Sequence, residues 1–374
     1  MENDSIEPLD PSKLPKVDTY QIWQEKQKIP VIKGFFVEDI KTVELEPWEL
    51  KGGLGAFVVL DGTGGINDAY ICEIHPGGKL KPQKHLYEEM IYVAKGHGAT
   101  TVWQKDGKKH TFEWGPGSIF AIPLNASYQH FNGSGTEPAR YFAVTNSSFM
   151  MNLFHNLDFI FGDEFVFADR FNPEQEDYFS GKGQVYGRFY MTTNFVSDTH
   201  TVGLKDYSER GAGGTNMKFD LAGQTMGCHI SEFPVGTYKK GHRHGPGAHV
   251  IILSGQGYSV LWIDENDKKR VDWRPGSVVV PPNQWFHQHF NSGAQPSRYL
   301  AFRWGAWRFR FMRLTDSEGS TYKSLKQGGA QIEYEDEDPN IHREFEAAMA
   351  KAGASCRMAS YHRGCTYRAT AKAG

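Results

Sequence analysis

The runs GHRHGPGAHVIILSGQG at residues 241–257 and PPNQWFHQHFN at residues 281–291 decide how this chain is interpreted. His242 and His244 are two residues apart, and side chains at that spacing share one face of a β-strand. His287 comes much later in the chain, in another strand-like run. If the strands between these runs fold into a small barrel, the three imidazoles can converge inside it. The pattern therefore predicts a metal site made of His242, His244 and His287.

Composition places the chain among globular proteins that are rich in turns. It has 374 residues, of which 39% are hydrophobic and 23% charged, with 41 glycines and 18 prolines. The net charge of −3 gives no electrostatic reason to expect a nucleic acid or a membrane surface as partner. The polar start resembles no signal peptide, and no apolar run approaches the length of a membrane span. We therefore expect a cytoplasmic protein.

The second half of the chain repeats the first at a constant offset in residue number. At this offset the run Gln129–Asn132 falls on Gln288–Asn291 and matches it letter for letter, and glycine and proline turns separate short strand-like runs in both halves. We therefore expect five segments: an N-terminal arm (1–54), a first β-barrel (55–146), a linker (147–214) with a flexible stretch at 211–214, a second β-barrel (215–305) and a C-terminal tail (306–374). The tail should contain one helix, which Asp338 and Pro339 open and Gly353 ends.

The two halves resemble the paired motifs of the cupin family. In the second half the motif positions hold Gly236, His242, His244, Gly255, Gly276, Pro282, His287 and Asn291. In the first half Gln83 replaces the first motif histidine and Tyr128 the last, while His85 and Glu89 remain. The resemblance implies an all-β bicupin, with two tandem double-stranded β-helix (jelly-roll) barrels, of which the second is equipped to hold a metal.

A narrower resemblance concerns the second half. The pattern His-Arg-His-x-Pro-x-Ala from His242, with the later Pro-Asn-x-x-x-His-x-His, is similar to the gentisate and 1-hydroxy-2-naphthoate dioxygenases. That resemblance implies Fe(II) held by His242, His244 and His287, and O2 as a co-substrate. Imidazole also suits Zn, Ni and Cu, and Mn stays open as well, so the ligand type does not select one metal. Three neutral ligands leave positions for a chelating anionic or aromatic small molecule.

Four further residues of the second half are candidates for catalytic or pocket roles. His289 has an equivalent in His130, which favours a structural or supporting role over direct chemistry. His249 could be a fourth ligand or a pocket residue, or otherwise a histidine on the face of a strand. Arg303, whose counterpart is Thr145, could pair with a substrate carboxylate or lie on the surface. Trp285 is expected in the core or in the pocket wall.

Two weaker groups could also hold an ion. In the first barrel these are His85, Glu89 and His130, with Gln83 as an oxygen ligand. In the tail, Cys356, His362 and Cys365 offer two thiols and one imidazole, although a single Cys-x8-Cys pair is a weak signal for zinc.

Three classes of function remain open at this point. The first is an Fe(II) dioxygenase that cleaves an activated C–C bond of a hydroxy acid. The second is a metal-dependent decarboxylase, isomerase or lyase that acts on a small acid without O2. The third is a non-enzymatic binding bicupin. Since the two fused barrels mimic a dimer, we also expect further homo-oligomers.

Overall fold

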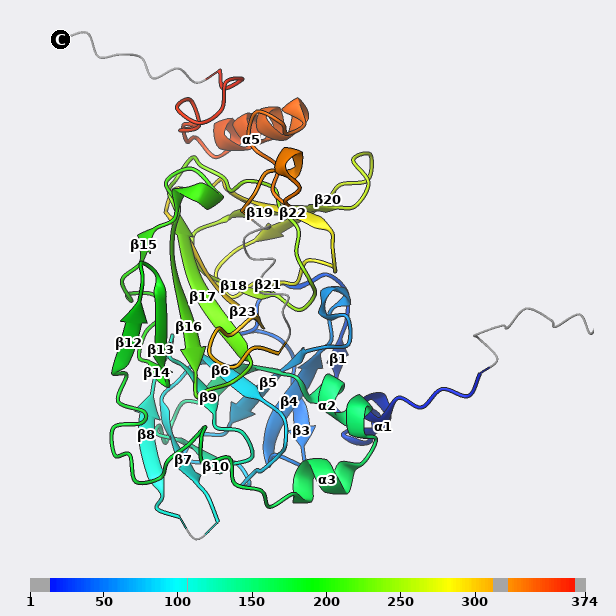
Figure 1. Cartoon of the computed structure of the whole chain (residues 1–374), viewed down its shortest axis with the longest axis vertical. Coiled ribbons are helices and arrows are strands. Elements are labelled where there is room, and N and C mark those ends of the chain that lie inside the picture. Colours follow the sequence, from blue (N-terminus) through cyan, green and yellow to red (C-terminus); the bar gives the residue numbers. More distant parts are fainter. Residues whose placement is uncertain (1–13, 106, 312–321, 367–374) are drawn as a thin grey trace, which may run out of the picture.

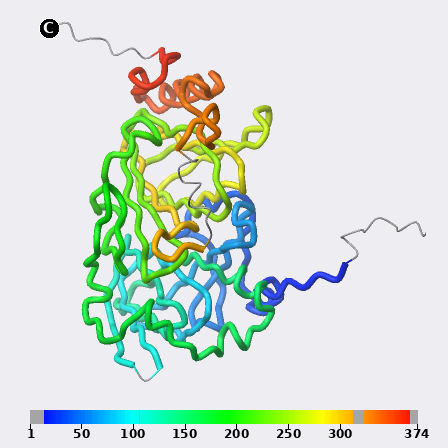
Figure 2. Tube along the Cα trace, in the orientation of Figure 1, coloured from blue at the N-terminus to red at the C-terminus, as the bar shows by residue number. Residues whose placement is uncertain are grey.

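The computed structural model describes residues 14–105, 107–311 and 322–366. Figure 1 shows two β-barrels that follow one another along the long axis, with helix α5 (Pro339–Lys351) at the far end of the second. The same view as a tube shows the N-terminal half of the chain in the lower barrel and the C-terminal half in the upper one (Figure 2). The prediction of an all-β chain with two tandem barrels and a short helical tail is confirmed.

The first barrel consists of an eight-stranded sheet, in the order β1-β4-β5-β11-β6-β9-β14 with β3 on β4, and of the three-stranded sheet β10-β7-β8. Buried and partly exposed residues alternate along β7 and β10, since one face of each strand packs on the core. The strands are β1 (Val31–Ile32), β3 (Glu46–Trp48), β4 (Gly53–Val58), β5 (Asp68–Ile74), β6 (Glu89–Lys95), β7 (Gly98–Trp103), β8 (His110–Trp114), β9 (Ile119–Ile122), β10 (Ser127–Asn132), β11 (Ala139–Thr145) and β14 (Phe195–Val196).

The second barrel repeats this arrangement. A nine-stranded sheet has the order β12-β13-β16-β17-β23-β18-β21-β2 with β15 on β16, and a three-stranded sheet has the order β20-β19-β22. The strands are β2 (Phe36–Val37), β12 (Gly183–Tyr186), β13 (Tyr190–Thr193), β15 (Lys205–Asp206), β16 (Thr215–Leu221), β17 (Met226–Phe233), β18 (His249–Ser254), β19 (Gly257–Trp262), β20 (Lys269–Trp273), β21 (Val278–Val279), β22 (Phe286–Asn291) and β23 (Ser297–Trp304).

The barrels exchange one short strand each. Strand β2 comes from the N-terminal arm but pairs with β21 of the second barrel, and β14 follows the first barrel in sequence but pairs with its strand β9. The two exchanged strands are the same dipeptide, Phe-Val, and they correspond to one another at the offset of the repeat. The repeat therefore extends into both the arm and the segment expected to be a linker.

One arginine in each half holds the exchanged segment in place. Arg140 pairs with Glu73 at 2.7 Å and donates to the carbonyls of Ile40 and Val43 in the arm. Arg298 pairs with Glu232 at 3.2 Å and donates to the carbonyls of Thr199 and Val202. These equivalent contacts explain why both halves contain the arginine.

Helices lie outside the barrels. The side chain of Asp18 caps α1 (Thr19–Lys26), and the Tyr20 amide donates to Asn152 of α2 at 3.0 Å. The Asp338 side chain caps α5, with Pro339 in its first turn, as the sequence predicts. Ile341, Phe345 and Met349 form its buried face. The remaining helices are α2 (Ser147–Phe154), α3 (Leu157–Gly162) and the 3-10 turns Asp61–Thr63, Ser208–Arg210 and Leu325–Gln327.

The segment 147–214 is not an unstructured connection. It contains α2 and α3 and contributes β12, β13, β14 and β15 to the two large sheets. Its stretch 211–214, expected to be flexible, is packed instead: Ala212 is buried, and its amide donates to the Tyr334 hydroxyl at 3.0 Å. The glycines there allow a close approach, because a Cβ on Gly211 would lie 2.8 Å from the Lys239 backbone.

Candidate metal centre

Backbone pairing brings two of the three histidines together. His287 lies in β22, and His242 lies beside it in an isolated antiparallel bridge. The His242 amide donates to the His287 carbonyl at 3.0 Å, and the His287 amide returns a bond of 2.8 Å. Because directly opposed residues of an antiparallel pair point to the same face, both rings enter the barrel. His244, two residues on, joins them from the same side.

The three imidazoles converge. Their ring centroids lie 4.1 Å apart for His242 and His287, 4.6 Å for His244 and His287, and 5.6 Å for His242 and His244. One ring nitrogen from each lies within 4.8 Å of the others, a span that one ion can bridge with bonds of ~2.0–2.1 Å after small ring adjustments.

Hydrogen bonds select the tautomer of each ring. The Nδ1 atoms of His242, His244 and His287 lie 3.2, 2.7 and 3.2 Å from the carbonyl oxygens of Lys240, Gly245 and Trp285. Since a carbonyl can only accept, each Nδ1 carries the proton and each Nε2 keeps its lone pair. Backbone carbonyls orient metal-binding histidines in this way.

The three histidines are also poised in the neutral form. Burial lowers the pKa of His242 and His287 well below 6.5, helped by the Arg210 cation and by the neighbouring imidazoles. Burial, followed by the Arg303 charge, lowers the pKa of His244 to about 4. At neutral pH all three are therefore unprotonated, as metal ligands must be. This donor set fits one divalent cation.

The histidines line a cavity of about 40 Å³. Four of its described lining residues are cationic: Arg210, Lys218, Lys239 and Arg303. None of the lining residues that the structure describes is an aspartate or a glutamate. Lys239 donates to Ser231 at 2.5 Å, and Lys218 donates to Tyr322 at 3.2 Å. The cavity is therefore electropositive, which attracts an anion.

His289 lines the same cavity at the end of a hydrogen-bonded chain. Trp273 Nε1 donates to Ser259 Oγ at 3.0 Å, and that oxygen lies 2.7 Å from His289 Nδ1. With the indole already donating, the hydroxyl is free to donate to Nδ1, which leaves Nε2–H as the donor group of the ring. The first barrel has the same chain from Trp114 through Thr100 to His130. The arrangement is shared by both halves, so it does not depend on the three-histidine cluster.

The other three candidates differ in where they lie. Arg303, on β23, lines the cavity. His249 does not line it: its ring faces Phe142 of the first barrel at 6.1 Å, because strand alternation turns Ala248 inward instead. Trp285 does not line it either and packs against Phe35 of the N-terminal arm at 6.0 Å. The structure therefore supports a pocket position for Arg303 and His289 but not for His249 and Trp285.

The first barrel has a different interior. Gln83 turns away, and its amide donates to the carbonyls of Leu50 and Pro82 at 3.1 and 3.0 Å. His85 Nε2 lies 3.4 Å from Glu89, and the ammonium of Lys51 lies 3.8 Å from the same carboxylate. The cation that faces Glu89 is thus a lysine, and His85, Glu89, His130 and Gln83, which the sequence left open as a weak ion site, do not form a ligand cluster among the described residues.

Two cavity residues do not belong to any motif, yet the repeat could have revealed them. At the offset of the repeat Arg210 corresponds to Lys51, so both halves carry a buried cation at this position. Lys239 corresponds in the same way to Leu80, and each donates its amide to the equivalent histidine carbonyl at 2.9 Å. An apolar residue in one barrel is thus a buried lysine in the other, which marks the second barrel as chemically distinct.

A family model matches part of the first barrel. Residues 70–145 match the family model of the cupin domain, as the motifs predict. A glucose-6-phosphate isomerase of Pyrococcus furiosus is 37% identical over 67 residues, which are 17% of this chain and 35% of that protein. The chain thus spans about a third of the length of the curated relatives it matches.

Solved structures that resemble this one include two oxalate decarboxylases. The enzyme of Lactobacillus farciminis, in a formate complex, has a TM-score of 0.49 at 11% identity, covering 79% of this chain and 92% of that one. The enzyme of Bacillus subtilis, described with Mn(II) centres, has a TM-score of 0.47 at 14% identity, covering 72% and 77%. Among the helices that the structure describes, none has the length and apolar character needed to cross a bilayer.

Proposed function

We propose that the second barrel is the active site of a divalent-metal enzyme that acts on a small organic anion. His242, His244 and His287 would hold the ion through Nε2, and the cationic lining would hold the substrate. One cavity is lined both by three neutral, oriented imidazoles and by four cationic side chains, those of Arg210, Lys218, Lys239 and Arg303. This combination is the observation that carries the proposal. Neutral ligands leave the full charge of the ion for the substrate.

The favoured reaction class is a conversion without O2, such as decarboxylation, isomerisation or elimination on a small carboxylic acid. The cavity holds about 40 Å³, whereas a cavity that admits a benzene ring measures about 150 Å³. A few heavy atoms therefore fit better than an aromatic ring. In such reactions negative charge develops on a carboxylate or enolate oxygen, and the bound ion would act there as a Lewis acid.

The chain's own residues would bind and orient the substrate. Arg303 and Arg210 would contribute positive charge beside the substrate carboxylate, and Arg210 also donates to Gln331 Oε1 at 3.1 Å. The Nε2–H of His289 is a fixed donor, because the Trp273–Ser259 chain holds its ring. Burial lowers the pKa of Lys239, which brings its amine closer to the range in which it can exchange a proton. Lys239, His287 and His289 are buried, so charges beside them act in a lower dielectric than that of water.

A second candidate is an Fe(II) dioxygenase. The favouring observation is Ala248, which stands where the first barrel has Glu89 and leaves an all-imidazole donor set. That donor set, with the motif from His242, is the basis of the resemblance to gentisate dioxygenases. On this alternative a hydroxy acid would chelate Fe(II) and O2 would be consumed. Mn, Zn, Ni and Cu remain the alternative ions for the non-oxidative class.

The test is purification without added metal, followed by metal analysis and assays with small mono- and dicarboxylic, keto and aromatic hydroxy acids. Each acid is assayed with and without O2, with Mn2+, Fe2+ or Zn2+ restored. Turnover in the absence of O2 supports the favoured class, and stoichiometric O2 uptake with Fe2+ selects the dioxygenase. Turnover by neither route, with anion binding retained, would leave a binding protein and overturn the proposal.

A further inference from the structure

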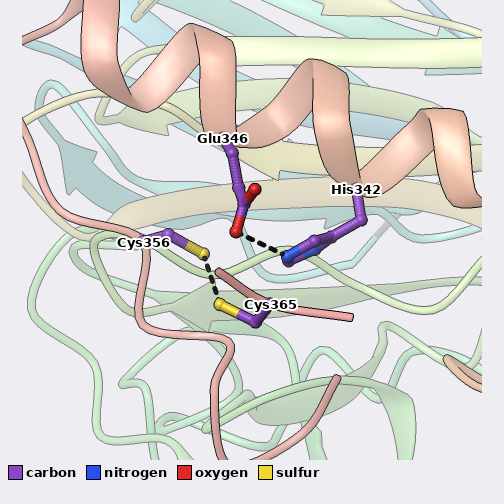
Figure 3. A group of neighbouring side chains, drawn as sticks. All are labelled: His342, Glu346, Cys356 and Cys365. Atoms are coloured by element: carbon purple, nitrogen blue, oxygen red, sulfur yellow. Dashed lines mark hydrogen bonds and ion pairs between the residues drawn. The ribbon is translucent and has the colours of Figure 1, made fainter. Parts of the chain in front are cut away.

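A second cluster of ligand-type side chains lies outside the cavity, between α5 and the tail that follows it. His342 and Glu346 are four residues apart and project from the same side of α5, while Cys356 and Cys365 approach from the tail (Figure 3). One ligand atom from each of the four residues lies within 4.8 Å of all the others. His342 and both cysteines are buried.

The distance between the two sulfur atoms fits a shared ion. The Sγ atoms of Cys356 and Cys365 lie 3.6 Å apart. That is too far for a disulfide bond, whose length is about 2.05 Å. Two thiolates on one tetrahedral zinc, with bonds of about 2.3 Å, lie about 3.8 Å apart. The pair therefore has the separation that zinc imposes.

The hydrogen bonds of His342 direct its lone pair into the cluster. The Tyr238 hydroxyl donates to Glu337, so it has no proton left for His342 Nδ1 at 2.9 Å. His342 Nδ1–H must then donate to Tyr238, which in the neutral ring leaves the Nε2 lone pair facing Glu346 Oε1 at 3.2 Å. Two acceptors at this distance repel one another unless a metal cation or a proton on Nε2 lies between them. This is an indication of a ligand that is independent of the residue types.

A neighbouring group competes for the same histidine but is already satisfied. Glu337, His342 and His362 also lie within ligand distance of one another. However, Glu337 accepts from Tyr238, from Gln288 at 3.0 Å and from His362 at 3.2 Å. Glu346 also accepts, from the amide and the hydroxyl of Thr366 at 2.7 and 2.9 Å, but Glu346 lies within ligand distance of both thiols and Glu337 does not. The His362 ring stacks on His342 at 4.0 Å, and His362 is not in the group that contains the two thiols.

We propose that His342, Glu346, Cys356 and Cys365 bind one Zn2+ ion in a closed, structural site. Borderline-soft zinc prefers thiolate and imidazole, and four protein ligands leave no position for a substrate. On binding, both thiols lose their protons to solvent and become thiolates. The sequence alone suggests Cys356, Cys365 and His362, so the proposal keeps the cysteines and replaces His362 by two residues of α5.

Such an ion would fasten the tail to the second barrel. The amide of Arg357, next to Cys356, donates to the Gly236 carbonyl of the barrel at 2.8 Å. Tyr238, Phe345 and Met349 share one apolar cluster with both cysteines. Since this cluster is small, a metal that joins α5 to the tail would supply much of its rigidity.

Cobalt(II) distinguishes this site from the three-histidine site, because only cobalt bound to thiolate gives a sulfur-to-metal charge-transfer band in the near ultraviolet. The full-length reduced protein, stripped of metal and titrated with Co2+, should show this band. Cys356→Ser and Cys365→Ser should abolish it. His242→Ala should keep it, so failure here is separable from failure of the proposed function. Cys228→Ala and His362→Gln are the matched controls and should also keep it.

A second measurement needs no variant and so avoids the question of folding. Titrating the thiols of zinc-loaded wild-type protein with a mercurial, in the presence of a chromophoric chelator, should release one equivalent of Zn2+.

Glu346→Gln should weaken zinc binding by about 10- to 100-fold. The proposal is overturned if no thiolate band forms, if no zinc is released, or if thiol counts under denaturing conditions reveal a disulfide.

Discussion

The ammonium of Lys51 lies 3.8 Å from the carboxylate of Glu89 inside the first barrel, at the position that corresponds to the histidine cluster of the second. Lys51 also donates to the hydroxyls of Tyr70 and Tyr128 at 2.8 and 3.2 Å. At the offset of the repeat, Tyr128 corresponds to His287 and Glu89 to Ala248. One barrel therefore contains a cation tethered to its own chain, while the other presents ligands for an exchangeable one.

Replacing Lys51 should destabilise the first barrel severely. The Lys51→Met variant leaves the Glu89 carboxylate buried without its cation, a change that costs about 3–5 kcal/mol. Urea denaturation at pH 7 measures the loss. The double variant Lys51→Met/Glu89→Gln removes both charges and should recover most of it. A loss below about 1 kcal/mol in the single variant would contradict the pairing.

The same ion pair of Lys51 and Glu89 should make the free energy of unfolding fall as the pH becomes acidic. Burial alone raises the pKa of Glu89, but Lys51 and the His85 hydrogen bond outweigh it and lower the pKa to about 2. A folded pKa below the ordinary 4.5 stabilises the fold above pH 4.5, and this contribution of about 3 kcal/mol is lost as pH falls toward 2. In Glu89→Gln this part of the pH dependence, measured by denaturation between pH 2 and 5, should be absent.

The three histidines should each be needed for the metal of the second barrel. His242→Ala or His287→Ala removes one Nε2 ligand and should weaken metal binding by more than about 100-fold, since outer partners alone change it by about 10- to 100-fold. Metal content after dialysis, compared with the wild type, measures this. His85→Ala in the first barrel is the control and should leave that metal bound. Unchanged occupancy in both second-barrel variants would refute the assignment.

The cationic lining should determine substrate affinity. Lys239→Met and Arg303→Gln each remove one positive charge from the cavity and should raise KM for the anionic substrate by at least about 10-fold, with the metal still bound. Lys240→Gln is a matched control, because Lys240 pairs with Glu333 at 2.5 Å and does not line the cavity. Equal effects of the variants at 239 and 240 would show that only overall charge matters.

Much of this architecture could be predicted from the repeat, and the exceptions have physical causes. The turns, strand alternation and shared QHFN run indicate two barrels, because these signals are local. Strands β2 and β14 could not be predicted, since two-residue strands carry too short a pattern and their partners lie far away in the sequence. In Figure 1 the exchanged strand β14 lies at the junction of the two barrels, beside β9.

The candidate metal centre likewise contains residues that the sequence predicts and residues that it does not. The histidine spacing predicted which imidazole rings come together. Lys51 precedes β4 and Arg210 precedes β16, and both become buried only through tertiary packing, which no local sequence pattern indicates. His249 does not line the cavity, because successive residues of a strand point to opposite faces and it is Ala248 that points inward. Ala248, which lines the cavity, is the residue at the motif's glutamate position.

Restoring that glutamate should change which metal the second barrel prefers. Ala248→Glu places a carboxylate where Glu89 lies in the first barrel, so it adds an anionic oxygen ligand to the three imidazoles. Carboxylate oxygen favours Mn2+ more than imidazole does, and Mn2+ affinity should rise by about 10-fold or more. The added negative charge also offsets part of the cationic lining, so the anionic substrate should bind more weakly. Calorimetric titration with Mn2+ measures the first effect, and Ala248→Gln, of the same size but neutral, is the control. If both variants bind Mn2+ equally, the side chain at position 248 does not reach the ion. Residue 248 would then match Glu89 in backbone position only.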